Sequence, residues 1–201
     1  MKVPVTIYAE MTPNPRAMKF VANIPLILNG EAYEYTSTDN LESSPLARVL
    51  FTFPFIEGVM ISQNFVTLTI VPNLDWNDVA LEVRDYVTNY LQAGQPIIEE
   101  AAISVSQVSQ EKKESSITEL PKPGEVRDID KKIQHILKEY VSPAIESDGG
   151  AVSFESFKDG ELIVKLSGAC NGCPSSTQTL QFGIQNIFEK LLPQVKKVSS
   201  I

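Results

Sequence analysis

Residues 168–177 read Gly168-Ala169-Cys170-Asn171-Gly172-Cys173-Pro174-Ser175-Ser176-Thr177. This stretch holds both cysteines of the 201-residue chain, three positions apart. One close pair is a poor disulfide framework for an extracellular fold, and the spacing favours metal binding or redox chemistry instead. Cys170 and Cys173 are therefore the candidate site residues.

The cysteine pair lies between a predicted strand and a predicted helix. Pro174 suits the first turn of a helix, and the hydroxyl residues after it can bind free amide groups. At a helix N-terminus the dipole and the open N–H groups favour thiolate over thiol, which raises both nucleophilicity and metal affinity. Gly168 and Gly172 let the backbone come close to sulfur without side-chain obstruction.

The number of ligands predicts a homodimer. Iron–sulfur and structural zinc sites usually need four protein ligands, whereas one chain supplies two thiolates. His135, the sole histidine, is predicted to face solvent on its helix. A second copy that presents its own cysteine pair across a two-fold axis is the simplest way to complete the site.

The segment around the pair predicts the order helix, strand, strand, helix, strand. The first helix is expected to end before Ser142-Pro143, because proline disfavours a helical residue before it. Strands are predicted at residues 152–157 and 162–166 around Asp159-Gly160, which suits a tight hairpin turn. A second helix and a last strand, residues 195–201, follow. The apolar stripes of the two helices are Ile129, Ile133, Ile136, Leu137, Tyr140 and Val141, and Leu180, Ile184, Ile187, Phe188 and Leu191.

The N-terminal part predicts a small sheet covered by a helix. Strands are expected at residues 5–10, 17–22 and 65–71, with a proline-stiffened turn at 12–15. Asp75 caps a helix with a buried stripe. That stripe consists of Val79, Val83, Tyr86, Val87, Tyr90 and Leu91.

A polar segment divides the chain. Residues 94–126 are rich in Ser, Gln, Glu, Lys and Pro and predict a flexible linker. It separates an N-terminal domain, residues 1–93, from a C-terminal domain, residues 127–201, which contains the cysteine pair. The predicted fold class is α+β, with two small α/β-sandwich-like domains joined by a flexible linker and the C-terminal order α-β-β-α-β.

Net charge and hydropathy argue against two classes of partner. The formal net charge of -8 argues against binding to a phosphate backbone, so no nucleic-acid partner is expected. No apolar run approaches the roughly 20 residues of a spanning helix, so no membrane partner is expected. The first residues resemble neither a signal peptide nor a transit peptide, and a cytoplasmic setting is the default expectation.

The C-terminal segment resembles the C-terminal domain of the NifU/Nfu family of iron–sulfur scaffold proteins. The matching residues are Asp148-Gly149-Gly150, the hairpin, the motif from Gly168 to Thr177, and Thr179-Leu180. The N-terminal segment resembles the Nfu N-terminal domain through Thr12-Pro13-Asn14-Pro15, Met18-Lys19-Phe20 and residues 55–59. Two departures from the family pattern are Ala151, where Asp is often found, and Ser142, where Arg is frequent.

The resemblance implies a scaffold or carrier without catalytic turnover. Cys170 and Cys173 would bind a cluster, usually 4Fe-4S, shared between two protomers and passed on to apo-proteins after delivery by an upstream donor. Two other interpretations remain open. A thiol–disulfide oxidoreductase would also use a helix N-terminus, but the preceding aromatic residue and the parallel strand-helix-strand frame are lacking. The other interpretation is a zinc-bridged structural dimer, because four thiolates would bind zinc equally well on geometry alone.

Overall fold

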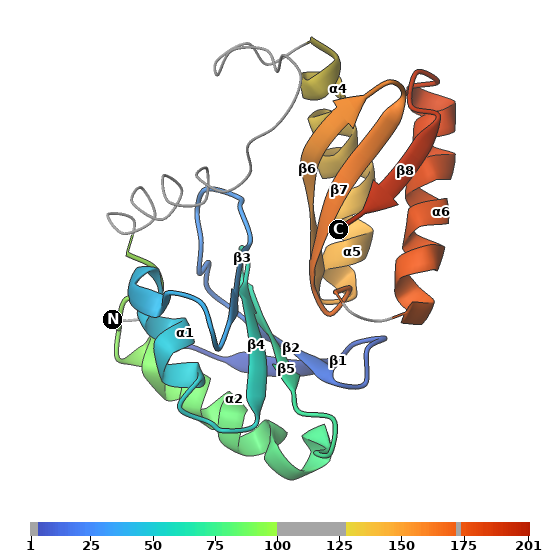
Figure 1. Cartoon of the computed structure of the whole chain (residues 1–201). Helices are drawn as coiled ribbons and strands as arrows, with labels where there is room; N and C mark the ends of the chain where they lie inside the picture. The colour runs from blue at the N-terminus through green and yellow to red at the C-terminus, as the bar shows by residue number, and fades with distance from the viewer. Residues whose placement is uncertain (1–3, 100–127, 172–173) are drawn as a thin grey trace.

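The computed structural model describes residues 4–99, 128–171 and 174–201, with the backbone alone for residues 174–178. Figure 1 shows two domains, each with its own sheet and helices. This confirms the predicted α+β class and the two-domain organisation. Within the described residues, none of the helices combines the length and the apolar character that spanning a bilayer requires.

The N-terminal domain is built on a five-stranded sheet in the order β1-β2-β5-β4-β3. Its strands are β1 (Ile7–Met11), β2 (Ala17–Ala22), β3 (Tyr33–Thr36), β4 (Ile56–Ile61) and β5 (Phe65–Ile70), and all neighbours are antiparallel. The three predicted strands are confirmed with ends shifted by up to two residues. Strands β3 and β4 were not predicted, since Pro54 and Gly58 interrupt the apolar pattern and β4 has an irregular register between Ile56 and Gly58.

One face of this sheet packs against the helix α2 (Trp76–Gln92). The Asp75 side chain accepts a hydrogen bond from the Asn77 amide, so the predicted cap is confirmed. The short elements η1 (Leu41–Ser43) and α1 (Pro45–Leu50) complete the domain. Met60 and Thr67 lie outside this core cluster, yet each is only 1% exposed. Another part of the protein therefore covers the opposite face of the sheet.

The chain that follows α2 stays against the N-terminal domain up to Glu99. Ile97 and Ile98 pack against its core, and the Ser44 hydroxyl donates to the Ile97 carbonyl at 2.9 Å. The predicted linker, residues 94–126, otherwise lies outside the described residues. The boundaries of the domains stay a prediction.

The C-terminal domain follows the predicted order. It comprises α4 (Asp128–Ile136), the π-helical turn η2 (Leu137–Val141), α5 (Ser142–Ser147), β6 (Gly150–Lys158), β7 (Glu161–Gly168), α6 (Pro174–Leu191) and β8 (Lys197–Ser200). Strand β7 pairs antiparallel with β6 and parallel with β8. Residues from both helical segments and the sheet form one core, which includes Ile133, Leu162 and Phe188.

The predicted end of the first helix before Ser142-Pro143 is wrong. The chain continues through η2 into α5 as far as Ser147. Pro143 lies in the first two positions of α5, where a missing N–H costs little. The π turn changes the hydrogen-bonding register just before the proline, so the helical path continues through it.

Candidate functional site

The candidate site is the turn between β7 and α6. We call residues 168–171 the cysteine turn, since it presents Cys170 directly after the strand. The Asn171 amide donates to the Gly168 carbonyl at 3.0 Å, which closes the turn before α6 begins at Pro174. Gly168 has a φ of 67°, a conformation that favours glycine. Cys173, the second predicted site residue, lies outside the described residues.

Cys170 points into the C-terminal domain. The residue is 3% exposed and belongs to the domain's core cluster. A β-carbon on Gly150 would lie only 2.5 Å from the Cys170 Sγ and 3.1 Å from the Ile145 Cγ2. Gly150 therefore makes the space in which the sulfur lies.

The Asp148-Gly149-Gly150 segment is more than a connection. The sequence predicts a helix-to-strand link, and the φ of 76° at Gly149 agrees with that. The Gly149 carbonyl also accepts a hydrogen bond from the Ala169 amide at 3.1 Å. Since Gly150 pairs with Gly168 in the sheet, the two glycine-containing corners lie side by side.

The N-terminal domain contacts the same corners. The Asn14 side-chain amide donates to the Ala169 carbonyl at 3.2 Å, and the Gly168 amide donates to the Glu34 carboxylate at 2.8 Å. The Thr67 hydroxyl donates to the Gly149 carbonyl at 2.7 Å. Two of these bonds go to backbone groups of the cysteine turn, and the third goes to Gly149, the residue before Gly150.

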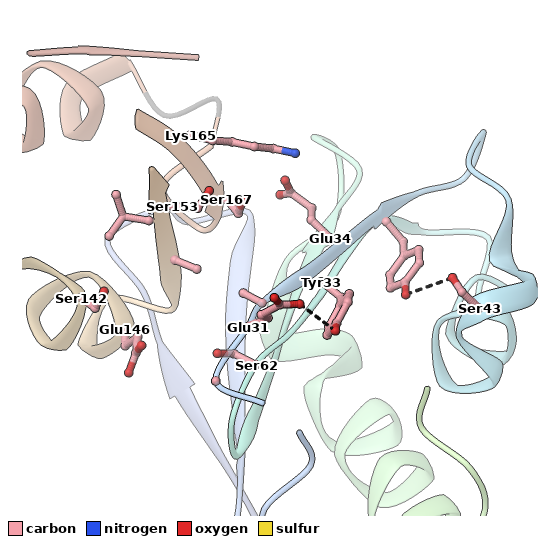
Figure 2. A pocket seen from close by; sticks show the side chains of 15 residues that line it. Glu31, Tyr33, Glu34, Ser43, Ser62, Ser142, Glu146, Ser153, Lys165 and Ser167 are labelled. Carbon is pink, nitrogen blue, oxygen red and sulfur yellow. Dashed lines mark hydrogen bonds between the residues drawn. The ribbon is translucent and has the colours of Figure 1, made fainter. Parts of the chain in front are cut away.

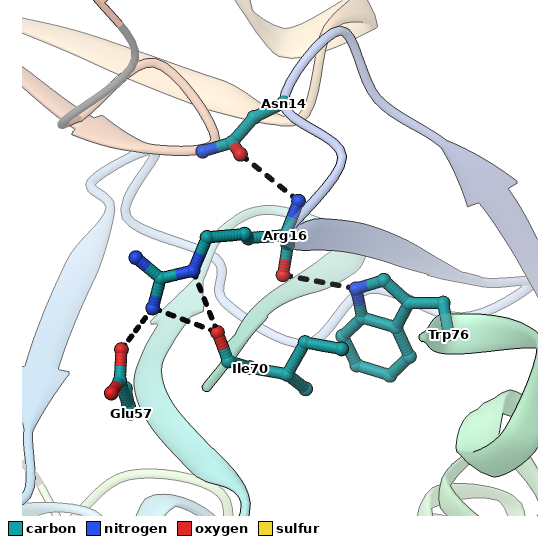
Figure 3. A network of polar contacts seen from close by, with 5 residues as sticks. All are labelled: Asn14, Arg16, Glu57, Ile70 and Trp76. Atoms are coloured by element: carbon teal, nitrogen blue, oxygen red, sulfur yellow. Dashed lines mark hydrogen bonds and ion pairs between the residues drawn. The ribbon is translucent and has the colours of Figure 1, made fainter. Parts of the chain in front are cut away.

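Asn14 lies on a turn that hydrogen bonds within the N-terminal domain hold in place. Its side-chain carbonyl accepts from the Arg16 amide at 3.0 Å, while the Arg16 guanidinium binds the Ile70 carbonyl and pairs with Glu57. The Trp76 indole donates to the Arg16 carbonyl at 3.0 Å. Figure 3 shows this network beneath Asn14. The predicted proline-stiffened turn at 12–15 is thus anchored to β5 and α2.

A polar pocket of about 550 Å³ lies beside the cysteine turn, between the two domains. In Figure 2, Glu34 from β3 and Lys165 from β7 extend toward one another across it. Glu146 of α5 lines the pocket. Burial raises the pKa of its carboxyl above the ordinary value, and the charge of Lys19 partly offsets this shift.

The sole histidine lies away from the site. His135 is exposed on α4, as predicted. Within residues 4–99, 128–171 and 174–201, no group of three or more His, Cys, Asp or Glu side chains is placed to hold a metal ion.

Asn14, Glu34 and Thr67 were not predicted as part of the site. Of the regions that contact the site, the sequence indicated only residues 12–15, which were predicted as a proline-stiffened turn. Glu34 and Thr67 look like ordinary strand residues, because nothing in their local sequence reports which domain covers that face of the sheet.

Fold and site together define a two-domain α+β protein with a cysteine pair before a helix. The family profile described as "Scaffold protein Nfu/NifU N terminal" matches residues 7–94, and the "NifU-like domain" profile matches residues 133–199. The chain belongs to the Nfu/NifU family.

Curated relatives cover nearly the whole chain. A Drosophila erecta protein named "NFU1 iron-sulfur cluster scaffold homolog, mitochondrial" is 26% identical over 207 residues, which cover 100% of this chain and 69% of that protein. The proteins of the same name from Drosophila sechellia and Drosophila grimshawi are 26% and 27% identical over 195 residues, covering 97% of this chain. This chain spans 64% and 61% of their lengths.

Two solved structures resemble parts of the chain. The solution structure of a NifU-like protein from Saccharomyces cerevisiae shows 25% identity and a TM-score of 0.44, over 50% of this chain and 91% of that one. A crystal structure of a Staphylococcus aureus protein shows 16% identity and a TM-score of 0.35, over 40% of this chain and 95% of that one.

Proposed function

We propose that this protein is an iron–sulfur cluster scaffold and carrier that binds its cluster through Cys170 and Cys173. The observation that carries the proposal is the position of Cys170, on a tight turn after β7 and before α6, in a chain of the Nfu/NifU family. The names of the curated relatives, which describe cluster scaffold homologues, support the same function.

The ligand count supports a cluster that bridges two copies of the chain. Each chain contributes two thiolates, and together they supply the four ligands that a cluster usually takes. The proposed cluster is 4Fe-4S. Its binding is then linked to dimerisation, and thiols of an apo-protein can displace the ligands one by one. Because the cluster is cargo, we propose no catalytic turnover for the protein.

The Cys170 side chain must turn outward before it can bind iron shared with a second chain. In the structure its sulfur lies against Gly150 inside the domain. Apo-protein clients and a cluster donor are the proposed partners. The cytoplasmic setting expected from the sequence is part of the same proposal, and cell fractionation tests it.

Anaerobic reconstitution with iron and sulfide tests the proposal. Wild type is compared with Cys170→Ser and Cys173→Ser. His135→Ala is the matched control, because histidine can also bind iron but His135 lies away from the site. We expect visible sulfur-to-iron absorption and bound iron and sulfide in wild type and in His135→Ala, and their loss in both serine variants. Iron and sulfide analysis with Mössbauer spectroscopy separates a 4Fe-4S from a 2Fe-2S cluster.

Two results would contradict the scaffold function. A colourless protein that binds only zinc would favour a structural dimer. A colourless protein that cycles a Cys170–Cys173 disulfide would favour an oxidoreductase. Transfer is tested by mixing the loaded protein with an apo-ferredoxin, and failure to pass the cluster to any apo-acceptor would argue against a carrier.

A further inference from the structure

The N-terminal sheet has a second face that the C-terminal domain covers. We call Thr12, Asn14, Glu34, Met60 and Thr67 the turn-facing residues. Met60 and Thr67 are 1% exposed and Asn14 is 8% exposed, although none of the three belongs to the core cluster beneath α2. Asn14, Met60 and Thr67 are thus buried between the domains, and Thr12 and Glu34 are half-buried there.

Three of the turn-facing residues form hydrogen bonds with backbone groups of the C-terminal domain. Asn14, Glu34 and Thr67 make hydrogen bonds to Ala169, Gly168 and Gly149, respectively. Because a backbone group moves whenever its turn changes conformation, the bonds to Ala169 and Gly168 depend on the shape of the cysteine turn. The Thr67 bond depends on the turn through the Gly149 carbonyl, which also accepts from the Ala169 amide. Together, these bonds hold the backbone on either side of the Cys170 side chain.

Close packing at two glycines reinforces this dependence on shape. A β-carbon on Gly168 would lie 2.6 Å from the Met60 Sδ, and one on Gly149 would lie 2.9 Å from the Thr12 Cγ2. Both glycines have positive φ. The N-terminal domain therefore fills the space that these glycines leave open.

We propose that the N-terminal domain docks on the cysteine turn of its own chain and holds it in the form that buries Cys170. Turning the thiol outward rotates the backbone of residues 168–171, which moves the Ala169 carbonyl and the Gly168 amide away from Asn14 and Glu34. Undocking of this face then precedes cluster binding. This role in regulation rests on the proposed function, whereas the docking itself does not.

The reactivity of the Cys170 thiol tests the docking without iron. In a Cys173→Ser background Cys170 is the sole thiol of the chain. We compare its modification rate by an aromatic disulfide reagent with the rate after the further changes Asn14→Asp and Thr67→Val. The aspartate keeps the acceptor for the Arg16 amide but removes the donor to Ala169, and valine is isosteric with threonine. We expect a rate increase on the order of tenfold, from the loss of two buried hydrogen bonds.

The matched control is Asn23→Asp/Thr69→Val in the same background. Among the described residues, the Asn23 side chain bonds to Thr6 and Pro4 of its own domain, and Thr69 lies on the same strand as Thr67. We expect its rate to equal that of the background protein. An equal rate in the Asn14/Thr67 variant, or an increase that its lower unfolding free energy accounts for completely, would overturn the proposal.

A second variant and a cluster-loading rate provide two further tests. If the double variant fails to fold, Glu34→Ala removes the acceptor of the Gly168 amide from a half-buried strand position and is judged by the same rates. With Cys173 restored, the Asn14/Thr67 variant should load cluster faster than wild type. A wild-type protein that binds no cluster would contradict the proposed function, while the thiol rates would still decide whether the domain docks.

Discussion

At the scale of single residues, Gly150 leaves the space that the Cys170 sulfur occupies. Its φ is not positive, so alanine is compatible with the backbone there, and the atoms nearest to an added β-carbon belong to the Cys170 and Ile145 side chains. We predict that Gly150→Ala lowers the free energy of unfolding of the C-terminal domain by about 1–3 kcal/mol, because the added methyl group overpacks the core. Urea unfolding of the reduced apo-protein measures the change.

Gly183→Ala is the control for this substitution. Gly183 is exposed on α6, and a β-carbon there would meet nothing within 4 Å. We expect it to stabilise the domain by about 0.5–1 kcal/mol, since alanine is the better helix former. Equal stability changes at positions 150 and 183 would contradict the close packing of Gly150 on Cys170.

The raised pKa of the Glu146 carboxyl predicts that the free energy of unfolding depends slightly on pH. Burial raises its pKa in the folded protein, so the folded state binds this proton more tightly than the unfolded state does. The ionised group therefore costs stability at pH values above its folded pKa, and the cost disappears as the pH falls below the unfolded value. We predict that Glu146→Gln stabilises the protein at pH 7 by less than about 1 kcal/mol, because the half-buried side chain is screened by solvent.

Urea unfolding at pH 7 and at pH 4 measures this difference. Glu155→Gln, a change at an exposed position on β6, is the control. An advantage of Glu146→Gln that grows as the pH falls would contradict the assigned direction.

At the scale of elements, the β6–β7 hairpin depends on its two-residue turn. Asp159 and Gly160 have φ values of 52° and 86°, and Lys158 pairs with Glu161 across them. These angles are those of the predicted tight turn. We predict that Gly160→Ala costs about 1–2 kcal/mol, because a side chain is strained in the left-handed region.

Asp159→Asn in the same turn should change stability by less than about 0.5 kcal/mol, since asparagine tolerates this conformation. The urea transition of the C-terminal domain measures both variants. A Gly160→Ala protein as stable as wild type would show that the turn relaxes to another type.

At the scale of the whole molecule, the proposed bridged site links assembly to the cluster. A cluster held by two chains should keep the protein dimeric, and its removal should lower the affinity between chains. We predict that anaerobic iron chelation shifts the loaded protein from dimer to monomer in sedimentation velocity. The Cys170→Ser/Cys173→Ser variant, treated in the same way, should show one unchanged sedimentation coefficient. A loaded protein that sediments as a monomer would contradict the bridge.

The sequence alone determined the features that depend on local patterns. The Asp75 cap, the Asp159-Gly160 turn and the C-terminal element order follow from residue type and spacing, because caps, turns and amphipathic stripes involve neighbours in the chain. The path of the first helix through Pro143 was missed, since the π turn before it leaves no clear local signal.

Only the tertiary structure decided what surrounds Cys170. The hydrogen bond from Asn14 to Ala169 joins residues 155 positions apart, and that from Thr67 to Gly149 joins residues 82 apart. Strand alternation shows that Thr67 lies opposite to its buried neighbours, but it does not show which domain covers it. Burial of a side chain depends on the packing of distant elements, and for this reason the inward thiol and the docked sheet face emerged only from the fold.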